Sequence, residues 1–155
     1  MKLRIVIIDY GLGNIRSAQK SIELAMLESE LNGEVIISSD SKSLKHASHI
    51  ILPGQGSFEY CINGLTELTG MIEELTVQVI KKEIPLFGIC VGMQLLANNS
   101  LENGNHKGLG WINAEITKLP TNNLVLPHMG WNDIVFKTDH SITNGIQNNN
   151  FYFVH

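Results

Sequence analysis

The sequence has few cysteines, and their scarcity limits what chemistry they can support. Cys61 and Cys90 are its only cysteines among 155 residues, too few for a disulfide framework. Neither cysteine belongs to a group of residues with the spacing of a metal site. We therefore expect no metal and no cofactor, and a reducing compartment such as the cytoplasm.

Basic residues and long apolar runs are also scarce. Lysine and arginine total 11 against 15 aspartates and glutamates, the formal net charge is −4, and no basic run occurs. Nucleic acid and anionic membrane surfaces are therefore not expected partners. The apolar stretch at residues 3–8 ends at Asp9 without a cleavage site, and no run approaches the length of a membrane span. The sequence predicts a soluble cytoplasmic protein that is not exported.

What the sequence does contain is the composition of a packed globular protein. Hydrophobic residues make up 43% and charged residues 17%, which predicts one domain over residues 1–155. Strands are predicted at residues 3–8, 35–37, 49–52 and 85–89, and helices at residues 15–26, 58–62 and 70–82. This alternation predicts an α/β fold of three layers, with a mainly parallel sheet covered by helices on both faces.

Residues 85–96 are the stretch around which we expect the site to be organised. A short apolar strand meets an apolar segment of helical character, with Cys90 at the turn between them. This is the layout of a nucleophile elbow, whose sharp turn pushes the nucleophile out of the sheet with strained backbone angles. Gly88 and Gly92 would let the strand and the helix pass close together. The alternative is that Cys90 is a small, buried hydrophobic residue.

A second glycine-containing turn follows the third predicted strand. Its backbone N–H groups, at Gly54, Gln55 and Gly56, would be able to point at an anion, and Val91 in the elbow would supply another. A tetrahedral intermediate on Cys90 needs such donors. The alternative is a tight turn whose glycines serve backbone geometry alone.

Three candidate features follow predicted strands: the turn at residues 9–14, the loop at residues 53–56, and Cys90. The carboxyl ends of parallel strands share one edge of the sheet, where α/β folds bind ligands, so we expect these features on one rim. Gln94 lies one helical turn beyond Cys90, and its amide would be able to hold a polar substrate. The alternative for Gln94 is an ordinary solvent-exposed helix residue.

A cysteine nucleophile normally works with a histidine base, and the sequence shows no convincing one. No histidine is followed two residues later by an aspartate or glutamate that would orient it. We expect solvated positions for His46, His106 and His140, strand positions for His49 and His155, and a structural or interface role for His128.

The last third of the chain is more polar. A strand is predicted within residues 111–119 and a turn at residues 122–123. A turn-like segment at residues 127–132 leads into a strand through Val135, and a final apolar strand covers residues 151–155.

Several of these motifs together resemble a known family. Residues 87–96 and 52–58 look like the elbow and the glycine loop of triad-type, class I glutamine amidotransferases. Residues 9–17 and 127–132, supported by residues 108–110 and 152–155, resemble signatures of the amidotransferase subunits of imidazole glycerol phosphate synthases, which serve histidine biosynthesis. The resemblance covers the whole chain.

The resemblance implies a glutaminase with Cys90 as its nucleophile. Cys90 would attack the side-chain amide of L-glutamine and release ammonia, leaving a thioester that water hydrolyses to glutamate. Gln94 would help to bind glutamine, and the loop and elbow N–H groups would form the oxyanion hole. The ammonia would pass to a synthase (cyclase) partner in a heterodimer, with Asn14, His128 and Trp131 at or near the partner interface.

Two departures from the family pattern affect this interpretation. Gln55 occupies a position where members usually have a small apolar residue. Members also continue beyond a strand like the one ending in His155, to a catalytic histidine and glutamate, so we expect a C-terminally truncated chain with poor glutaminase activity. Two alternatives stay open: the same subunit type feeding a surface-sugar amidation synthetase, and a non-catalytic partner-binding module.

Overall fold

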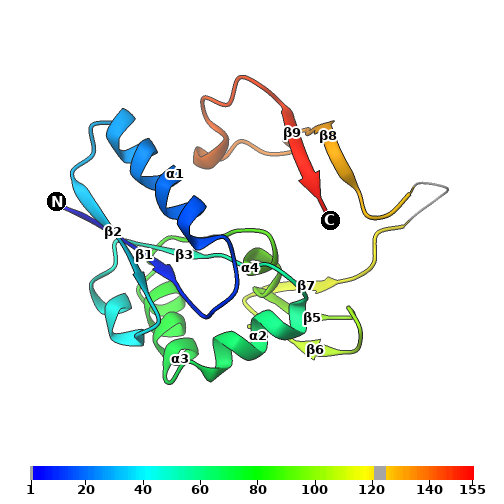
Figure 1. Ribbon diagram of the computed structural model, residues 1–155, viewed down its shortest axis with the longest axis horizontal. Coiled ribbons are helices and arrows are strands. Elements are labelled where there is room, and N and C mark those ends of the chain that lie inside the picture. Colours follow the sequence, from blue (N-terminus) through cyan, green and yellow to red (C-terminus); the bar gives the residue numbers. More distant parts are fainter. Residues whose placement is uncertain (1, 121–124) are drawn as a thin grey trace. The chain divides into compact units, whose positions relative to one another are not determined.

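A computed structural model describes residues 2–120 and 125–155 of the chain. The chain forms two compact units, Met1–Lys118 and Leu119–His155, which are considered separately (Figure 1). Whether the chain acts as one domain over residues 1–155 stays a prediction. The turn expected at residues 122–123 lies outside the described residues.

The centre of the first unit is a parallel sheet of four strands. These are β1 (Leu3–Ile8), β2 (Gly33–Ser38), β3 (His49–Leu52) and β4 (Leu86–Gly88). The spatial order is β2-β1-β3-β4, and every neighbouring pair is parallel. All four predicted strands are therefore confirmed, and their carboxyl ends lie at the same edge of the sheet.

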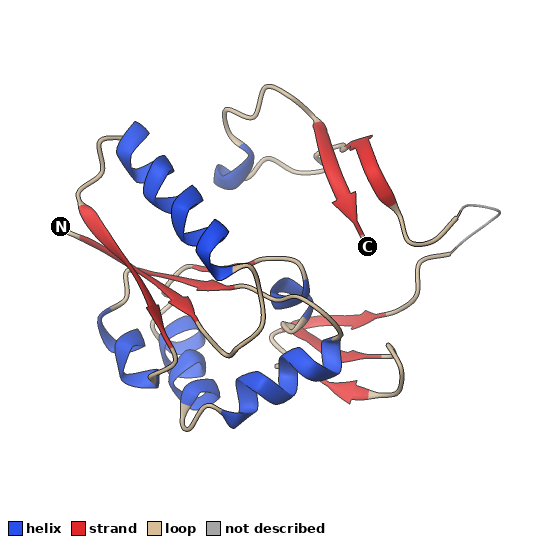
Figure 2. Cartoon of the chain, viewed as in Figure 1, coloured by secondary structure: helices blue, strands red, loops and turns tan. Residues whose placement is uncertain are grey.

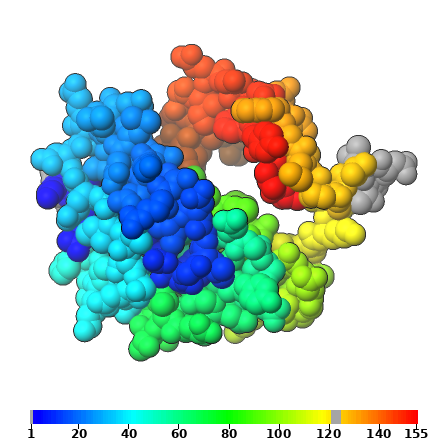
Figure 3. Space-filling view, in the orientation of Figure 1, coloured from blue at the N-terminus to red at the C-terminus, as the bar shows by residue number. Residues whose placement is uncertain are grey.

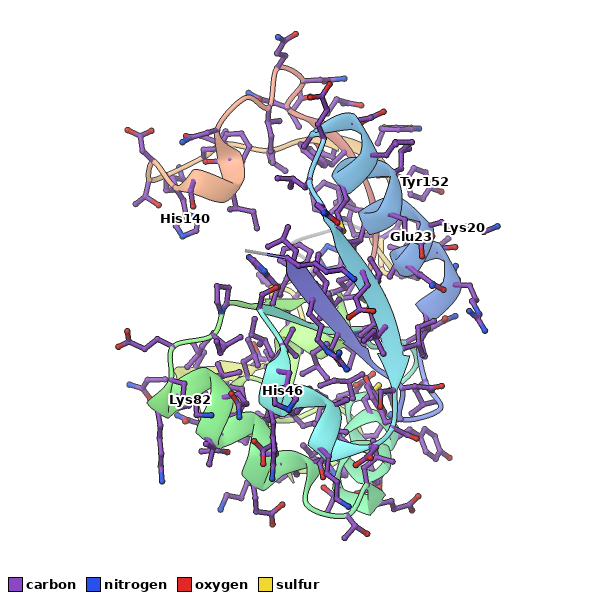
Figure 4. All side chains as sticks on the ribbon, turned by 90° about the vertical axis from the view of Figure 1, so that its left-hand side faces the viewer. Lys20, Glu23, His46, Lys82, His140 and Tyr152 are labelled. Atoms are coloured by element: carbon purple, nitrogen blue, oxygen red, sulfur yellow. The ribbon has the colours of Figure 1, made fainter. Side chains whose placement is uncertain are left out.

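Helical segments cover the two faces of this sheet. Helix α1 (Ile15–Glu28) packs on one face, and its outer side carries Lys20 and Glu23 (Figure 4). On the other face lie η1 (Ser41–His46), α2 (Phe58–Glu67) and α3 (Met71–Leu75). The α/β architecture with helices on both faces of a mainly parallel sheet is therefore confirmed. In the space-filling view, α1 and β2 adjoin at the surface (Figure 3).

Strand β1 shows how the sequence produces two cores. Ile5 and Ile7 belong to the cluster under α1, whereas Val6 and Ile8 belong to the larger cluster on the opposite face. Successive side chains of a strand point to opposite faces. An unbroken apolar run is therefore what a strand buried on both faces requires.

The predicted helix at residues 70–82 is divided in the structure. Helix α3 is followed directly by a π-helical segment, η2 (Thr76–Lys81). Gln78 within η2 is buried, and its side-chain amide donates to Glu74 Oε1 over 2.6 Å. The amphipathic pattern identified a helical segment correctly but did not distinguish its two hydrogen-bonding patterns.

A second sheet in the first unit was only partly predicted. Its strands β5 (Ala97–Ser100), β6 (His106–Lys107) and β7 (Ile112–Ile116) have the spatial order β6-β5-β7 (Figure 2). The alternating pattern of β7 was recognised in the sequence. Strand β5 was missed because it contains two adjacent asparagines, a residue type that is depleted in strands.

The second unit is organised around an antiparallel hairpin of β8 (Met129–Asp133) and β9 (Asn150–Val154). A short 3-10 helix, η3 (Ser141–Thr143), lies between these strands in sequence. The prediction that residues 127–132 are turn-like, with a strand continuing to Val135, is wrong. The strand begins at Met129 and ends at Asp133, because pairing with β9 determines its extent more strongly than its glycine and asparagine content.

Among the described residues, no helix is both long enough and apolar enough to cross a membrane.

Candidate active site

Cys90 lies at a strained turn between β4 and α4 (Val91–Gln94). Its φ is 54° and its ψ is −120°, a conformation that costs a non-glycine residue about 1–3 kcal/mol and occurs mainly at functional sites. The side chain is a free thiol exposed at the surface. The alternative that Cys90 is a buried hydrophobic residue is therefore wrong, and the predicted elbow geometry is confirmed.

The two glycines of the elbow are required by close backbone contacts. A Cβ atom on Gly92 would lie 1.9 Å from the carbonyl oxygen of Leu52, at the end of β3. A Cβ atom on Gly88 would lie 2.6 Å from Cα of Met93. The elbow therefore closes only when both positions lack a side chain.

The helix after Cys90 is shorter than the apolar pattern predicted. Helix α4 ends at Gln94, although the apolar run continues through Leu96. The carbonyl of Leu95 accepts from Leu109 N–H over 2.8 Å, and the carbonyl of Leu96 accepts from Trp111 and Ile112. Pairing with a distant segment thus ends the helix after one turn.

The loop after β3 packs directly against the elbow. A Cβ atom on Gly54 would lie 2.3 Å from the backbone nitrogen of Gly92. On its other side, a Cβ atom on Gly13 would lie 3.2 Å from Cβ of Pro53. The turn after β1, the loop after β3 and the elbow after β4 are therefore neighbours on one rim, as predicted.

The backbone N–H groups at this rim are available for a ligand. Within residues 2–120 and 125–155, the N–H groups of Gly54, Gln55, Gly56 and Val91 donate to no protein acceptor. Gly54 is buried, whereas Gln55 and Gly56 are exposed. Unpaired backbone N–H groups of this kind are the donors that an oxyanion requires.

Gln94 lies on the same helical turn as Cys90. Its N–H donates to the Cys90 carbonyl over 3.3 Å, so the two residues occupy neighbouring positions on the helix surface. The Gln94 residue is partly buried rather than fully solvated. Among the described residues, its side-chain amide forms no hydrogen bond.

Two further residues contact the loop, a third contacts the start of α2 beside it, and all three were missed in the sequence. The Tyr10 hydroxyl donates to the Pro53 carbonyl, and the Cys61 thiol donates to the Gln55 carbonyl over 3.4 Å. Glu102 Oε2 accepts from the N–H of the first α2 residue over 2.8 Å. The partners in these contacts are 6 to 44 positions apart in the sequence. No local sequence pattern therefore identifies them.

The two buried side chains that bond to the loop carbonyls, Tyr10 and Cys61, have raised pKa values. Burial raises the pKa of the Tyr10 hydroxyl and also that of the Cys61 thiol. Removing either group from water disfavours its charged form. Tyr10 and Cys61 therefore keep their protons at neutral pH and act as hydrogen-bond donors.

Four of the histidines are exposed or have surroundings within their own unit. His46 and His140 are exposed (Figure 4), and the His140 side chain caps η3 by accepting from Ile142 N–H. His49 lies 3.2 Å from the Ser48 hydroxyl, between Nδ1 and Oγ. The expectation that His106 is solvated is wrong, because its Nε2 atom is buried and has no hydrogen-bond partner among residues 2–120 and 125–155.

The remaining two histidines pair with each other on the hairpin. His128 Nδ1 and His155 Nε2 are 3.1 Å apart, and the His128 ring stacks on Phe153 with a centroid distance of 4.9 Å. Within residues 2–118, the described part of the first unit, no histidine forms a hydrogen bond with Cys90. The absence of a convincing base for Cys90 stays a prediction from the sequence.

The three residues expected at a partner interface differ in their surroundings. Asn14 caps α1, since its side chain accepts from Ser17 N–H over 3.3 Å. His128 is occupied by its contacts within the hairpin. Trp131 is 70% exposed, and its ring meets the edge of Tyr152 with ring centroids 5.6 Å apart.

Other possible sites in the first unit are weaker. Over the described ranges, no group of three or more His, Cys, Asp or Glu residues is arranged to hold a metal ion. A groove of about 560 Å³ lies between α2 and β6, with Asn63, His106 and Trp111 in its lining. Cys90 and the loop at residues 53–56 are not part of it, so this groove does not serve the elbow.

Comparison with known proteins decides which family has this arrangement. The family model described as "Glutamine amidotransferase class-I" matches residues 6–155. The chain belongs to the class-I glutamine amidotransferase family. The resemblance identified from the motifs around residues 52–58 and 87–96 is therefore confirmed.

Individual relatives show which members of the family the chain is similar to. The chain is 40% identical to "Imidazole glycerol phosphate synthase subunit HisH" of Rhodospirillum rubrum over 157 residues, covering 99% of this chain and 73% of that protein. It is 42% identical to "Imidazole glycerol phosphate synthase subunit HisH 2" of Methanococcus maripaludis, covering 97% and 72%.

A solved amidotransferase supports the fold. The chain aligns with a structure titled "Crystal structure of glutamine amidotransferase" with a TM-score of 0.55 and 21% identity. The alignment covers 71% of this chain and 54% of that one. At this identity the likeness concerns the fold alone, and it agrees with the predicted α/β class.

The close contact between Gly92 and the Leu52 carbonyl predicts that a single added methyl group destabilises the protein strongly. Gly92→Ala should lower the free energy of unfolding by about 3 kcal/mol, because the added Cβ would overlap the Leu52 carbonyl. Gly11→Ala is the control: its φ is 83° but its Cβ would meet nothing within 4 Å, so a loss of about 1 kcal/mol is expected. Equal losses in urea unfolding would contradict the role of the contact.

The two cysteines should differ in reactivity. Iodoacetamide at neutral pH should alkylate Cys90 on the order of 100-fold faster than Cys61, because Cys90 is exposed whereas Cys61 is buried with a raised pKa. Peptide mass spectrometry over time would give both rates. Urea-unfolded protein is the control, in which the rates should converge; similar slow rates in the folded protein would contradict the elbow assignment.

Proposed function

We propose that this chain is a glutaminase that releases ammonia from L-glutamine, with Cys90 as its nucleophile. The observation that carries the proposal is an exposed, strained Cys90 next to a loop whose N–H groups are unpaired in the described structure. Membership of the class-I glutamine amidotransferase family supports the same chemistry.

The proposed reaction has two stages. The Cys90 sulfur, after losing its proton, attacks the side-chain amide carbon of glutamine, and the carbonyl oxygen becomes an oxyanion. When the carbonyl re-forms, the C–N bond breaks and the nitrogen leaves as ammonia after gaining a proton. Water then attacks the resulting thioester and the sulfur leaves, so that glutamine and water give glutamate and ammonia.

The neighbouring groups have distinct roles in this proposal. The N–H groups of Gly54, Gln55, Gly56 and Val91 would supply the oxyanion hole, where losing one donor typically costs on the order of 10²–10³ in turnover. Gln94 would bind the polar part of glutamine through its unpaired side-chain amide, one helical turn from the nucleophile.

The ammonia is proposed to pass to a synthase partner in histidine biosynthesis. The HisH relatives are named as subunits of imidazole glycerol phosphate synthase, which supports a heterodimer with a cyclase subunit. Of the three candidate interface residues, Trp131 is the best placed, because its large apolar ring is exposed and such rings are enriched at interfaces. We place this reaction in the cytoplasm, where the two free cysteines would stay reduced.

Proton transfer should limit the glutaminase rate. Positioned acid–base groups contribute roughly 10²–10⁴ to such reactions, and within residues 2–118 no histidine forms a hydrogen bond with Cys90. We therefore expect slow glutamate release by the 155-residue chain mixed with its cyclase partner. Added imidazole should accelerate this release by about 10-fold or more, because it can accept the thiol proton.

Matched variants separate the proposal from its alternatives. Chromatographic measurement of glutamate should show no release above the blank in Cys90→Ala, with or without imidazole. His46→Ala, at an exposed position in η1, should behave as the unmodified chain. Release that persists in Cys90→Ala would exclude Cys90 as the nucleophile, and no release under any condition would favour a partner-binding module.

A further inference from the structure

Two buried side chains form hydrogen bonds with backbone carbonyls of the loop after β3. The Tyr10 hydroxyl, on a residue that is 6% exposed, donates to the Pro53 carbonyl. The Cys61 thiol, on a residue that is fully buried, donates to the Gln55 carbonyl over 3.4 Å. Tyr10 comes from the turn after β1, and Cys61 comes from α2. Two separate elements therefore bond to the loop, one to the Pro53 carbonyl and the other to the Gln55 carbonyl.

We propose that Tyr10 and Cys61 are positioning residues for the oxyanion hole, each fixing the orientation of one peptide group in the loop. This inference rests on the proposed glutaminase function. Neither side chain touches the reacting atoms in this proposal; each acts through the backbone of the loop.

The planarity of the peptide bond connects these contacts to the donors. A trans peptide places its C=O and N–H on opposite sides. Holding the Pro53 carbonyl towards Tyr10 therefore directs the Gly54 N–H the other way, and holding the Gln55 carbonyl towards Cys61 does the same for the Gly56 N–H. Both N–H groups are unpaired within the described ranges, so the two contacts orient free donors.

The loop needs such support because its own sequence provides little. Gly56 has a φ of 98°, and glycine adopts many backbone conformations with similar ease. Without its two carbonyl contacts, the loop would be able to rotate its peptide groups at small cost. An oxyanion hole contributes to the rate only when its donors are already oriented.

Both contacts require the protonated form of the side chain. Burial raises the pKa of the Tyr10 hydroxyl and of the Cys61 thiol, so each remains a donor at neutral pH. Ionised forms would instead place a negative charge beside a carbonyl oxygen. The acidity of the two groups thus agrees with the positioning role that the geometry indicates.

Four variants test the proposal. Tyr10→Phe removes one donor but keeps the ring, and Cys61→Ala removes the other. Cys61→Ser keeps a donor and should restore part of the loss. Tyr60→Phe is the matched control, since Tyr60 is 68% exposed on the same helix as Cys61 and its hydroxyl has no partner among the described residues.

The first readout concerns the loop and does not depend on activity. Carbonyl ¹³C shifts measured by NMR should change at Pro53 in Tyr10→Phe and at Gln55 in Cys61→Ala, with the amide signals of Gly54 and Gly56 following. Tyr60→Phe should leave all four signals in place. Unchanged Pro53 and Gln55 shifts in their respective variants would overturn the proposal.

The second readout separates oxyanion stabilisation from general damage to the elbow. Alkylation of Cys90 by iodoacetamide is a direct displacement that forms no oxyanion, whereas glutamine hydrolysis does. In Tyr10→Phe and Cys61→Ala, kcat for imidazole-assisted glutamate release should fall by on the order of 10-fold, with KM and the alkylation rate changed less than about twofold. A parallel fall in alkylation would indicate a purely structural role and overturn the proposal.

The two proposals fail in different ways. If the unmodified chain gives no Cys90-dependent glutamate, the glutaminase function fails, and the carbonyl shifts alone then decide whether Tyr10 and Cys61 hold the loop. If glutamate forms normally in all four variants, the glutaminase function stands and the positioning role is excluded.

Discussion

The structure depends on one close backbone contact, in which the start of α4 lies directly against the end of β3. Gly92 meets the Leu52 carbonyl so closely that no Cβ fits between them, and Gly54 meets the Gly92 nitrogen from the adjoining loop. This contact brings the turn that follows β4 against the loop that follows β3. It also leaves Cys90 as the residue that must adopt the strained conformation, with its thiol directed out of the sheet. The chemistry proposed for Cys90 follows from that constraint.

The parts that the sequence predicted well are those specified by neighbouring residues. The apolar run from Leu3 to Ile8 and the glycines around Cys90 carry their structural meaning within a few positions. The location of the candidate features at one edge of the sheet could therefore be predicted, because each feature follows a strand and the carboxyl ends of parallel strands lie at the same edge. The same reasoning failed where pairing with a distant segment decides the structure. Strand β5 forms from an asparagine-containing segment, and β8 begins at Met129 within a segment that reads locally as a turn.

The supports of the site were the least predictable part. Tyr10 lies 43 positions from Pro53, and Glu102 lies 44 positions from the residue whose N–H it accepts. Nothing in their local sequence marks these residues as partners of the loop after β3 or of the helix that follows it. Histidines illustrate the opposite limit, because a histidine is the usual base for a cysteine nucleophile but none within residues 2–118 forms a hydrogen bond with Cys90. His128 and His155 pair with each other, and the others serve strands, caps or exposed turns.

Covalent capture by a chloroketone analogue of L-glutamine tests the central claim most directly, because it combines recognition of glutamine with the reactivity of one thiol. Intact-mass measurement and peptide mapping of the unmodified chain should show a single adduct, located on Cys90, that forms more slowly when L-glutamine is present. An adduct on Cys61, or an adduct on Cys90 that L-glutamine does not slow, would contradict the assignment of this elbow as a glutamine site.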